Sequence, residues 1–178
     1  MSLRPSLTAL LCAALALPAA AAPDLVILVR HAERAAEPAA DHGLTPAGEL
    51  RAQALARALQ HAGVTAIVTT QFRRTRDTAA PLAQALGLQP QVVAARRGES
   101  DAHLRETADA VRALSGTVLV VGHSNTVPGL IRALGGPQLA ELCETSFGHA
   151  FVLKPGATPT LLTFGYGARD AEPAPGCL

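Results

Sequence analysis

The chain has 178 residues, of which 15 are basic and 14 acidic, so its formal net charge is +1 with neutral histidines. This near-balance provides no basic excess for nucleic acid or an anionic membrane surface, and we expect neither as a partner. The length fits a single domain of about 100–200 residues, which can bury a sizeable core without metal staples.

The first 22 residues have the composition of a secretory signal peptide. Arg4 supplies a positive start, an apolar run extends from Leu7 to Leu17, and small residues follow. That apolar run is shorter than the roughly 20 residues that cross a bilayer. We therefore predict a signal peptide at 1–22 and a mature domain at 23–178 that is periplasmic or secreted and has no membrane span. A retained anchor is the alternative, and the cleavage position stays open.

Strand-like and helix-like segments alternate along the mature chain. Residues 25–30 form a continuous apolar run, typical of a strand covered on both faces. Thr45 then caps a predicted helix with Pro46 in its first turn, and Gly63 ends it. The predicted inward face of that helix consists of Leu50, Ala54, Leu55, Ala58, Leu59 and Ala62.

The same alternation continues to the C-terminus. Apolar residues at i, i+3, i+4 and i+7 indicate a helix over 74–86. The other predicted helices are 100–114 and 126–134, and the remaining predicted strands are 64–69, 90–94, 117–122, 150–153 and 159–164. This order predicts an α/β fold, a three-layer α/β/α sandwich with a mostly parallel central sheet.

Two of the predicted strands end at a histidine. His31 follows Arg30 at the end of the first strand, and His123 lies between the strand at 117–122 and a helix. Ligands of open parallel sheets bind beyond the carboxyl ends of the strands, so we expect both imidazoles to project into one crevice. The helix N-terminus after His123 offers unpaired N–H groups and a positive dipole end, which favour a phosphoryl group.

Arginines accompany both histidines. Arg30 precedes His31, Arg34 lies in the loop after it, and Arg74 begins the helix that follows the second strand. A guanidinium presents paired donors to phosphate oxygens. An imidazole among such cations has its protonated form disfavoured, which keeps it a neutral nucleophile near neutral pH. The sequence therefore predicts a site that handles phosphate.

Four segments resemble, in order, the motifs of the histidine phosphatase (phosphoglycerate-mutase-like) superfamily. They are Val29-Arg30-His31-Ala32-Glu33, Leu44-Thr45-Pro46-Ala47-Gly48, Arg74-Thr75-Arg76-Asp77-Thr78-Ala79 and Val120-Val121-Gly122-His123-Ser124. The resemblance implies that His31 attacks phosphorus and carries a transient phosphohistidine. It also implies that Arg30, Arg74 and His123 hold the phosphoryl group, without a metal or other cofactor. Arg34 is a further candidate contact.

The general acid is the least defined part of this resemblance. The superfamily usually places a carboxylate between the arginine helix and the second histidine, where it protonates the leaving oxygen. Glu99, after a glycine, is the preferred candidate, and Asp101 is the alternative. Acids in the first turn of a helix commonly serve the helix dipole instead. The other histidines, predicted to lie at the surface or in loops, are His42, His61, His103 and His149.

Two cysteines, Cys143 and Cys177, remain in the predicted mature chain. In an oxidising compartment an even pair suggests a disulfide, with two free or separately buried thiols as the alternative. A disulfide would attach the C-terminal tail to the segment after Pro137 and stabilise the fold by roughly 3–4 kcal/mol. Neither cysteine has a histidine at zinc-ligand spacing, so we expect no metal site.

These features together predict a metal-independent phosphoric monoester hydrolase of the compact secreted phosphatase branch. Its expected substrate is a phosphorylated small molecule or an envelope-linked phosphate ester, because a secreted protein does not meet cytoplasmic substrates. The alternative is a non-catalytic phosphate- or sugar-phosphate-binding module of the same fold, which needs no proton donor. The sequence leaves the physiological substrate and the oligomeric state open.

Overall fold

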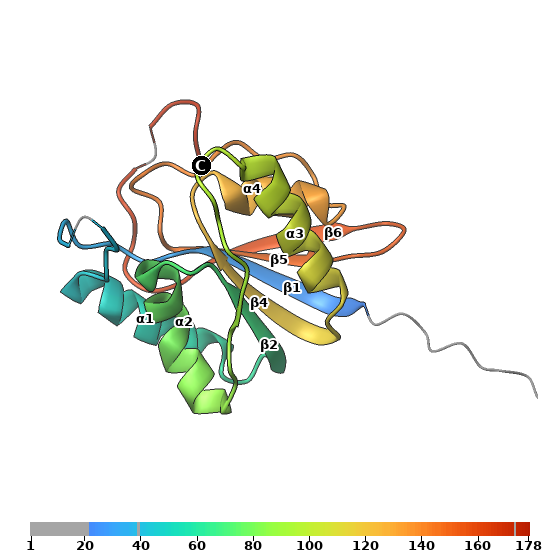
Figure 1. Ribbon diagram of the computed structural model, residues 1–178, viewed down its shortest axis with the longest axis horizontal. Helices are drawn as coiled ribbons and strands as arrows, with labels where there is room; N and C mark the ends of the chain where they lie inside the picture. The colour runs from blue at the N-terminus through green and yellow to red at the C-terminus, as the bar shows by residue number, and fades with distance from the viewer. Residues whose placement is uncertain (1–21, 39, 173) are drawn as a thin grey trace, which may run out of the picture.

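The computed structural model describes residues 22–38, 40–172 and 174–178, so residues 1–21 of the predicted signal peptide lie outside the described residues. One six-stranded sheet runs through the molecule in the order β3-β2-β4-β1-β5-β6 (Figure 1). Its strands are β1 (Pro23–Arg30), β2 (Val64–Thr69), β3 (Gln91–Val92), β4 (Gly116–Gly122), β5 (His149–Lys154) and β6 (Thr160–Gly165).

The sheet is mostly parallel, as predicted. β1 pairs parallel with β4, β4 with β2, and β2 with β3. β5 pairs antiparallel with β1, and β6 antiparallel with β5, so among the described strands β5 alone runs against the rest. The four neighbouring parallel strands β1 to β4 therefore present their carboxyl ends at one edge of the sheet.

Two helices cover each face of the sheet (Figure 1). α1 (Pro46–Leu59) and α2 (Arg73–Leu86) pack on one face, and α3 (Ser100–Arg112) and α4 (Thr126–Ala133) pack on the other. Alternate residues of β1 enter the two cores: Ile27 and Val29 face α1 and α2, while Val26 and Leu28 face α3 and α4. Burial on both faces explains the continuous apolar run, and the predicted three-layer α/β/α sandwich is confirmed.

The predicted inward face of α1 is wrong in part. Leu50 is 64% exposed, whereas the helix buries Arg51 together with Leu55 and Leu59. The reason is the close approach of Gly48 to the loop after β1, where an added Cβ would lie 2.3 Å from the carbonyl oxygen of residue 33. This approach turns Arg51 inward, where it forms ion pairs. Ala58 and Ala62, also predicted to be inward, are exposed.

Two further predictions concern shorter features. The strand expected at 90–94 is reduced to the two-residue edge strand β3. The predicted disulfide is present, since Cys143 and Cys177 are bonded across a sequence separation of 34 residues with their Cα atoms 5.1 Å apart. In the part of the chain that the structure describes, no helix has the length and hydropathy needed to cross a bilayer.

Candidate active site

Strand pairing brings the two histidines together. β1 and β4 are neighbours, with Arg30 paired in register to Gly122, and the backbone N–H of His31 donates to the Gly122 carbonyl at 2.9 Å. The rings of His31 and His123 consequently lie edge to face, with centroids 5.3 Å apart. The crevice predicted beyond the strand ends thus forms between β1 and β4.

Helix α2 brings Arg74 to the same place. Thr78, one turn further along α2, accepts a hydrogen bond from the backbone N–H of Ala32 at 2.9 Å, which ties the helix to the loop after β1. The Arg74 guanidinium lies 4.3 Å from the Phe72 ring centroid, and its Nη2 lies 3.4 Å from His123 Nδ1. Thr78 therefore positions the helix that carries Arg74, and Phe72 and His123 contact the Arg74 side chain.

His31 is held as a neutral nucleophile. Its Nδ1 lies 2.8 Å from the Ala32 carbonyl oxygen, which can only accept, so Nδ1 carries the proton and Nε2 keeps its lone pair. Burial lowers the pKa of His31 to about 4, with smaller contributions from the charges of Arg74 and Arg30. The predicted neutrality has burial as its main cause, rather than the neighbouring cations.

His123 has the opposite tautomer. The Arg74 guanidinium can only donate, so His123 Nδ1 accepts and Nε2 carries the proton, 3.3 Å from Thr70 Oγ1. Burial, followed by the nearby His31 and Arg74, lowers the pKa of His123 to about 3. Both imidazoles are therefore neutral at physiological pH.

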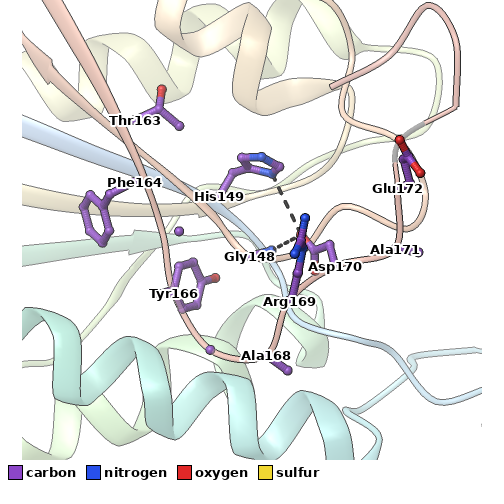
Figure 2. Close-up of a pocket in the computed structure, with 12 residues that line it drawn as sticks. Gly148, His149, Thr163, Phe164, Tyr166, Ala168, Arg169, Asp170, Ala171 and Glu172 are labelled. Carbon is purple, nitrogen blue, oxygen red and sulfur yellow. Dashed lines mark hydrogen bonds and ion pairs between the residues drawn. The ribbon is translucent and has the colours of Figure 1, made fainter.

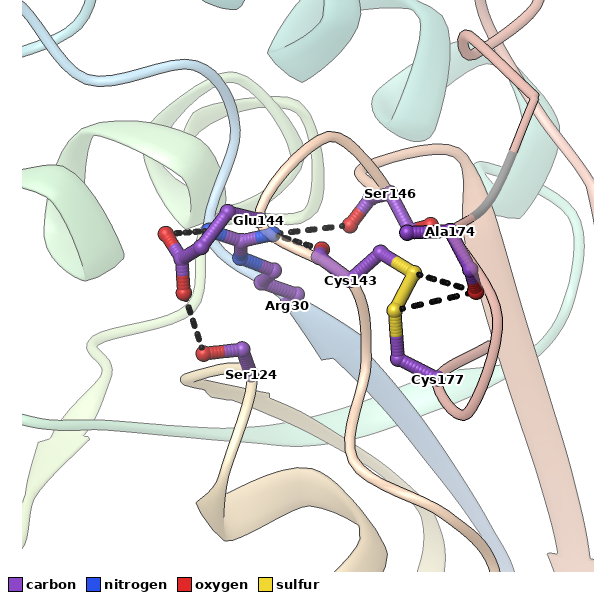
Figure 3. Close-up of a disulfide and its surroundings, with 7 residues drawn as sticks. All are labelled: Arg30, Ser124, Cys143, Glu144, Ser146, Ala174 and Cys177. Atoms are coloured by element: carbon purple, nitrogen blue, oxygen red, sulfur yellow. Dashed lines mark hydrogen bonds and ion pairs between the residues drawn. A yellow bond between two sulfur atoms is a disulfide. The ribbon is translucent and has the colours of Figure 1, made fainter.

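Arg30 is the most firmly held cation of the site (Figure 3). It is 3% exposed, and its Nη1 donates to the carbonyl oxygens of Cys143 at 2.6 Å and Ser146 at 3.1 Å. Its Nη2 donates to Glu144 Oε2 at 2.9 Å, and the guanidinium lies 4.2 Å from the Phe147 ring centroid. Its buried Nε finds no acceptor among the described residues.

These groups line a pocket of about 550 Å³ with an excess of cations. Its five arginines are Arg30, Arg34, Arg74, Arg96 and Arg97. Among the described lining residues, Glu144 is the only carboxylate. The buried Nε atoms of Arg30 and Arg74 lack acceptors within the described chain, and an anion bound in the pocket can supply them.

A larger hollow of about 850 Å³ lies elsewhere, between β6 and residues 166–172 (Figure 2). Its lining includes one arginine, Arg169, and two carboxylates, Asp170 and Glu172. Asp170 is already used, because its Oδ2 accepts from the backbone N–H groups of Phe147 and Gly148. The smaller pocket is the better candidate, since only there do a nucleophile and unpaired cationic donors meet.

The structure brings together five of the predicted site residues, namely His31, His123, Arg30, Arg34 and Arg74. It does not bring Glu99 or Asp101 into the pocket lining. The exposed carboxylate of Glu99 forms an ion pair with Arg96 at 3.5 Å instead. The preferred general acid therefore pairs with an arginine of the pocket but does not itself line it.

Several pocket residues escaped the sequence interpretation, Glu144 and His103 among them. Glu144 belongs to no motif, and its contacts with Arg30 and with Ser124 Oγ, at 3.0 Å, link residues far apart in sequence. His103 is 4% exposed on α3, so its predicted position at the surface or in a loop was wrong. The i, i+4 spacing of His103 and Thr107, beside the apolar positions 108 and 111, was a signal that could have located it.

The fold and the site define an α/β protein in which two neutral histidines and several arginines line one pocket. Among the described residues, no cluster of three or more His, Cys, Asp or Glu side chains could hold a metal ion. The profile of the histidine phosphatase superfamily (branch 1) matches residues 26–97. The matched segment contains Arg30, His31 and Arg74 of the pocket.

Solved structures share this fold. The protein from Agrobacterium tumefaciens assigned as phosphohistidine phosphatase SixA is 23% identical with a TM-score of 0.60, covering 83% of this chain and 99% of its own. The corresponding protein from Nakamurella multipartitia is 27% identical with a TM-score of 0.54, covering 81% and 96%. Mycobacterial glucosyl-3-phosphoglycerate phosphatase is 16% identical with a TM-score of 0.57, covering 82% and 99%. No curated protein matches the sequence.

Proposed function

We propose that this protein is a phosphatase of the histidine phosphatase superfamily, a metal-independent phosphomonoesterase that works through a phosphohistidine on His31. One observation carries the proposal: the Nδ1–H of His31 is bound to the Ala32 carbonyl, so Nε2 keeps its lone pair in a pocket lined by Arg30 and Arg74. A neutral imidazole with a fixed tautomer is a competent nucleophile toward phosphorus. Arg34 and His123 complete the proposed phosphoryl site.

The proposed reaction has two displacements. In the first, the Nε2 lone pair of His31 attacks phosphorus, a P–N bond forms, and the P–O bond to the leaving group breaks. In the second, water attacks the phosphohistidine, the P–N bond breaks, and inorganic phosphate leaves with His31 restored. Arg30, Arg74 and Arg34 offset the charge on the phosphoryl oxygens in both steps, the main contribution expected of the protein in phosphoryl transfer.

The source of the leaving-group proton shapes the expected substrates. Glu144 is the carboxylate of the pocket, but the charge of Arg30 and the hydrogen bond from Ser124 lower its pKa despite the opposing effect of burial. It is therefore ionised at neutral pH and a poor acid. We infer that leaving groups stable without protonation, such as phenolates, are released faster than alkoxides.

We further propose that the substrate is an extracytoplasmic or envelope-linked phosphate ester. Two observations support this: the signal-like composition of residues 1–22, and the disulfide, a bond typical of oxidising compartments. Arg96 and Arg97 line the pocket and are exposed to solvent. Such an accessible pocket suits a phosphate group that is carried on a larger molecule.

The test is phosphate release from p-nitrophenyl phosphate by residues 23–178 between pH 5 and 8, with EDTA present. Activity that survives the chelator and yields an acid-labile, base-stable phosphoenzyme on His31 supports the proposal. Activity that needs an added metal, or that leaves no label on His31 after a rapid alkaline quench, contradicts it. Phosphate binding without any turnover would instead favour the non-catalytic binding module.

A further inference from the structure

One short loop segment supplies all the described hydrogen-bond acceptors of the Arg30 side chain. This segment, residues 143–147, is called the Arg30 cradle below. The carbonyl oxygens of Cys143 and Ser146 take both hydrogens of Nη1, and the Glu144 carboxylate takes one hydrogen of Nη2. Phe147 lies against the guanidinium. Nε and the second Nη2 hydrogen are thereby left for phosphoryl oxygens.

The cradle belongs to no helix or strand, so it needs other anchors. At its beginning, Cys143 is bonded to Cys177 (Figure 3). The backbone N–H of Cys143 also donates to the Leu178 carbonyl at 2.7 Å. The Leu178 N–H in turn donates to the Glu141 carbonyl at 3.0 Å. The C-terminal tail is therefore attached to Cys143 by a disulfide and a hydrogen bond, and to Glu141, just before the cradle, by a second hydrogen bond.

The other end of the cradle is anchored by the same part of the chain. Asp170 Oδ2 accepts from the backbone N–H groups of Phe147 at 2.9 Å and Gly148 at 2.7 Å. Figure 2 shows the contact of Asp170 with Gly148. Asp170 is held by Arg51, whose Nη2 lies 3.0 Å from Oδ1. Asp170 is fixed by the domain body, whereas at Cys143 the anchor is the disulfide and the chain end.

We propose that the Cys143–Cys177 disulfide is a positioning element for catalysis, which holds the Arg30 cradle so that the Arg30 guanidinium meets the phosphoryl group. The proposal rests on the proposed function, in which Arg30 binds that group. Without the disulfide, Cys143 loses its covalent tie to the C-terminal tail, and we expect the Cys143 carbonyl to shift. A displacement of about 1 Å in such a contact can cost about 100-fold in rate.

This role differs from simple stabilisation, because its effect passes through Arg30. A disulfide that only stabilises the fold changes the unfolding equilibrium and leaves the kinetic constants of the folded enzyme unchanged. A disulfide that positions Arg30 changes those constants, and its removal matters little once the guanidinium is gone. A double-mutant cycle between the cysteines and Arg30 separates the two cases.

The experiment compares wild type with the Cys143→Ala/Cys177→Ala variant, well below the melting temperature of each. The readouts are KM and kcat for p-nitrophenyl phosphate and the inhibition constant of inorganic phosphate. We expect both KM and the inhibition constant to rise, and kcat/KM to fall about 10- to 100-fold. In the Arg30→Ala background, the same cysteine changes should alter kcat/KM by less than about two-fold.

Folded variants with constants within about two-fold of wild type overturn the proposal, as does an equal loss in the Arg30→Ala background. If the cysteine variant does not fold, the comparison is made on wild type reduced at low temperature with dithiothreitol, which donates two electrons and two protons to give two thiols. Arg30→Ala treated with dithiothreitol in the same way serves as the control. Loss of the fold on reduction also overturns the proposal, because the disulfide then acts on the whole domain.

Failure of the proposed function has a different signature. Oxidised wild type and the Cys143→Ala/Cys177→Ala variant would then both release no phosphate. The cradle is still tested in that case by calorimetric binding of inorganic phosphate, which requires Arg30 but no turnover. We expect weaker phosphate binding without the disulfide, and unchanged binding would overturn the positioning role.

Discussion

Arg30 and Arg74 line the same pocket, but different regions of the molecule hold them. Arg74 is oriented by its neighbours near the strand ends, through Phe72 and His123. Arg30 finds its acceptors 113 to 116 residues away, in the loop that the C-terminal tail anchors. The comparison teaches that a motif can supply an arginine while a remote segment without any motif orients it.

Substitution of the nucleophile His31, which works with both arginines, should have the largest effect on activity. His31→Ala removes the atom that attacks phosphorus, so kcat for p-nitrophenyl phosphate should fall by at least about 1,000-fold. His61→Ala, which changes an exposed histidine outside the pocket, is the matched control and should keep full activity. Substantial turnover by a folded His31→Ala protein would remove the phosphohistidine from the mechanism.

The two arginines should differ in stability more than in activity. Arg30→Ala and Arg74→Ala should each lower kcat/KM by about 100- to 1,000-fold, because each removes a donor to the phosphoryl oxygens. Arg30→Ala also leaves the buried Ser146 carbonyl without its Arg30 donor, at about 1–3 kcal/mol, whereas the Cys143 carbonyl keeps the Ser146 N–H. Thermal melts should therefore show a larger fall for Arg30→Ala, and equal melting temperatures would break the comparison.

The pH dependence should follow the two buried histidines. In the unfolded chain a histidine binds a proton near pH 6.5, whereas burial holds the pKa of His31 at about 4 and of His123 at about 3. Between these limits the unfolded state binds more protons, so the free energy of unfolding decreases as the pH falls from about 6.5 towards 4. Urea unfolding of wild type and His31→Ala at several pH values measures this, and the variant should show the shallower decline.

A smaller effect is expected at the contact between Glu144 and Arg30. Its carboxylate competes with phosphate for the guanidinium, so Glu144→Gln should tighten inhibition by inorganic phosphate about two- to five-fold, the range of an exposed ion pair. Glu141→Gln, in the same loop but outside the pocket, is the control. Weaker phosphate inhibition in Glu144→Gln would show that the carboxylate supports Arg30 more than it blocks it.

The smallest effect is expected at Glu99. Since Glu99 is not among the described residues that line the pocket, Glu99→Gln should keep kcat/KM within about two-fold for both aryl and alkyl phosphates. Phosphate release from p-nitrophenyl phosphate and glycerol phosphate gives the comparison. A loss confined to the alkyl substrate would restore Glu99 as the proton donor.

Much of the fold was predictable because its signals are local. The apolar run at residues 25–30 marks a strand buried on both faces, and Gly87 ends α2 with a positive φ of 66°. Leu50 was misplaced because its helix is rotated by one backbone contact at Gly48, which periodicity cannot detect. Such errors arise where a tertiary contact overrides an average helical pattern.

The sequence by itself determined which chemistry the chain offers: two histidines at strand ends, three accompanying arginines and a pair of cysteines, all in recognisable order. Only the tertiary structure decided the tautomer of His31, the exclusion of Glu99 from the pocket and the presence of Glu144 within it. Residue types and strand ends are local properties of a chain. Proton positions and carboxylate partners depend on distances between segments more than 100 residues apart, such as Arg30 and Glu144, which only the folded chain sets.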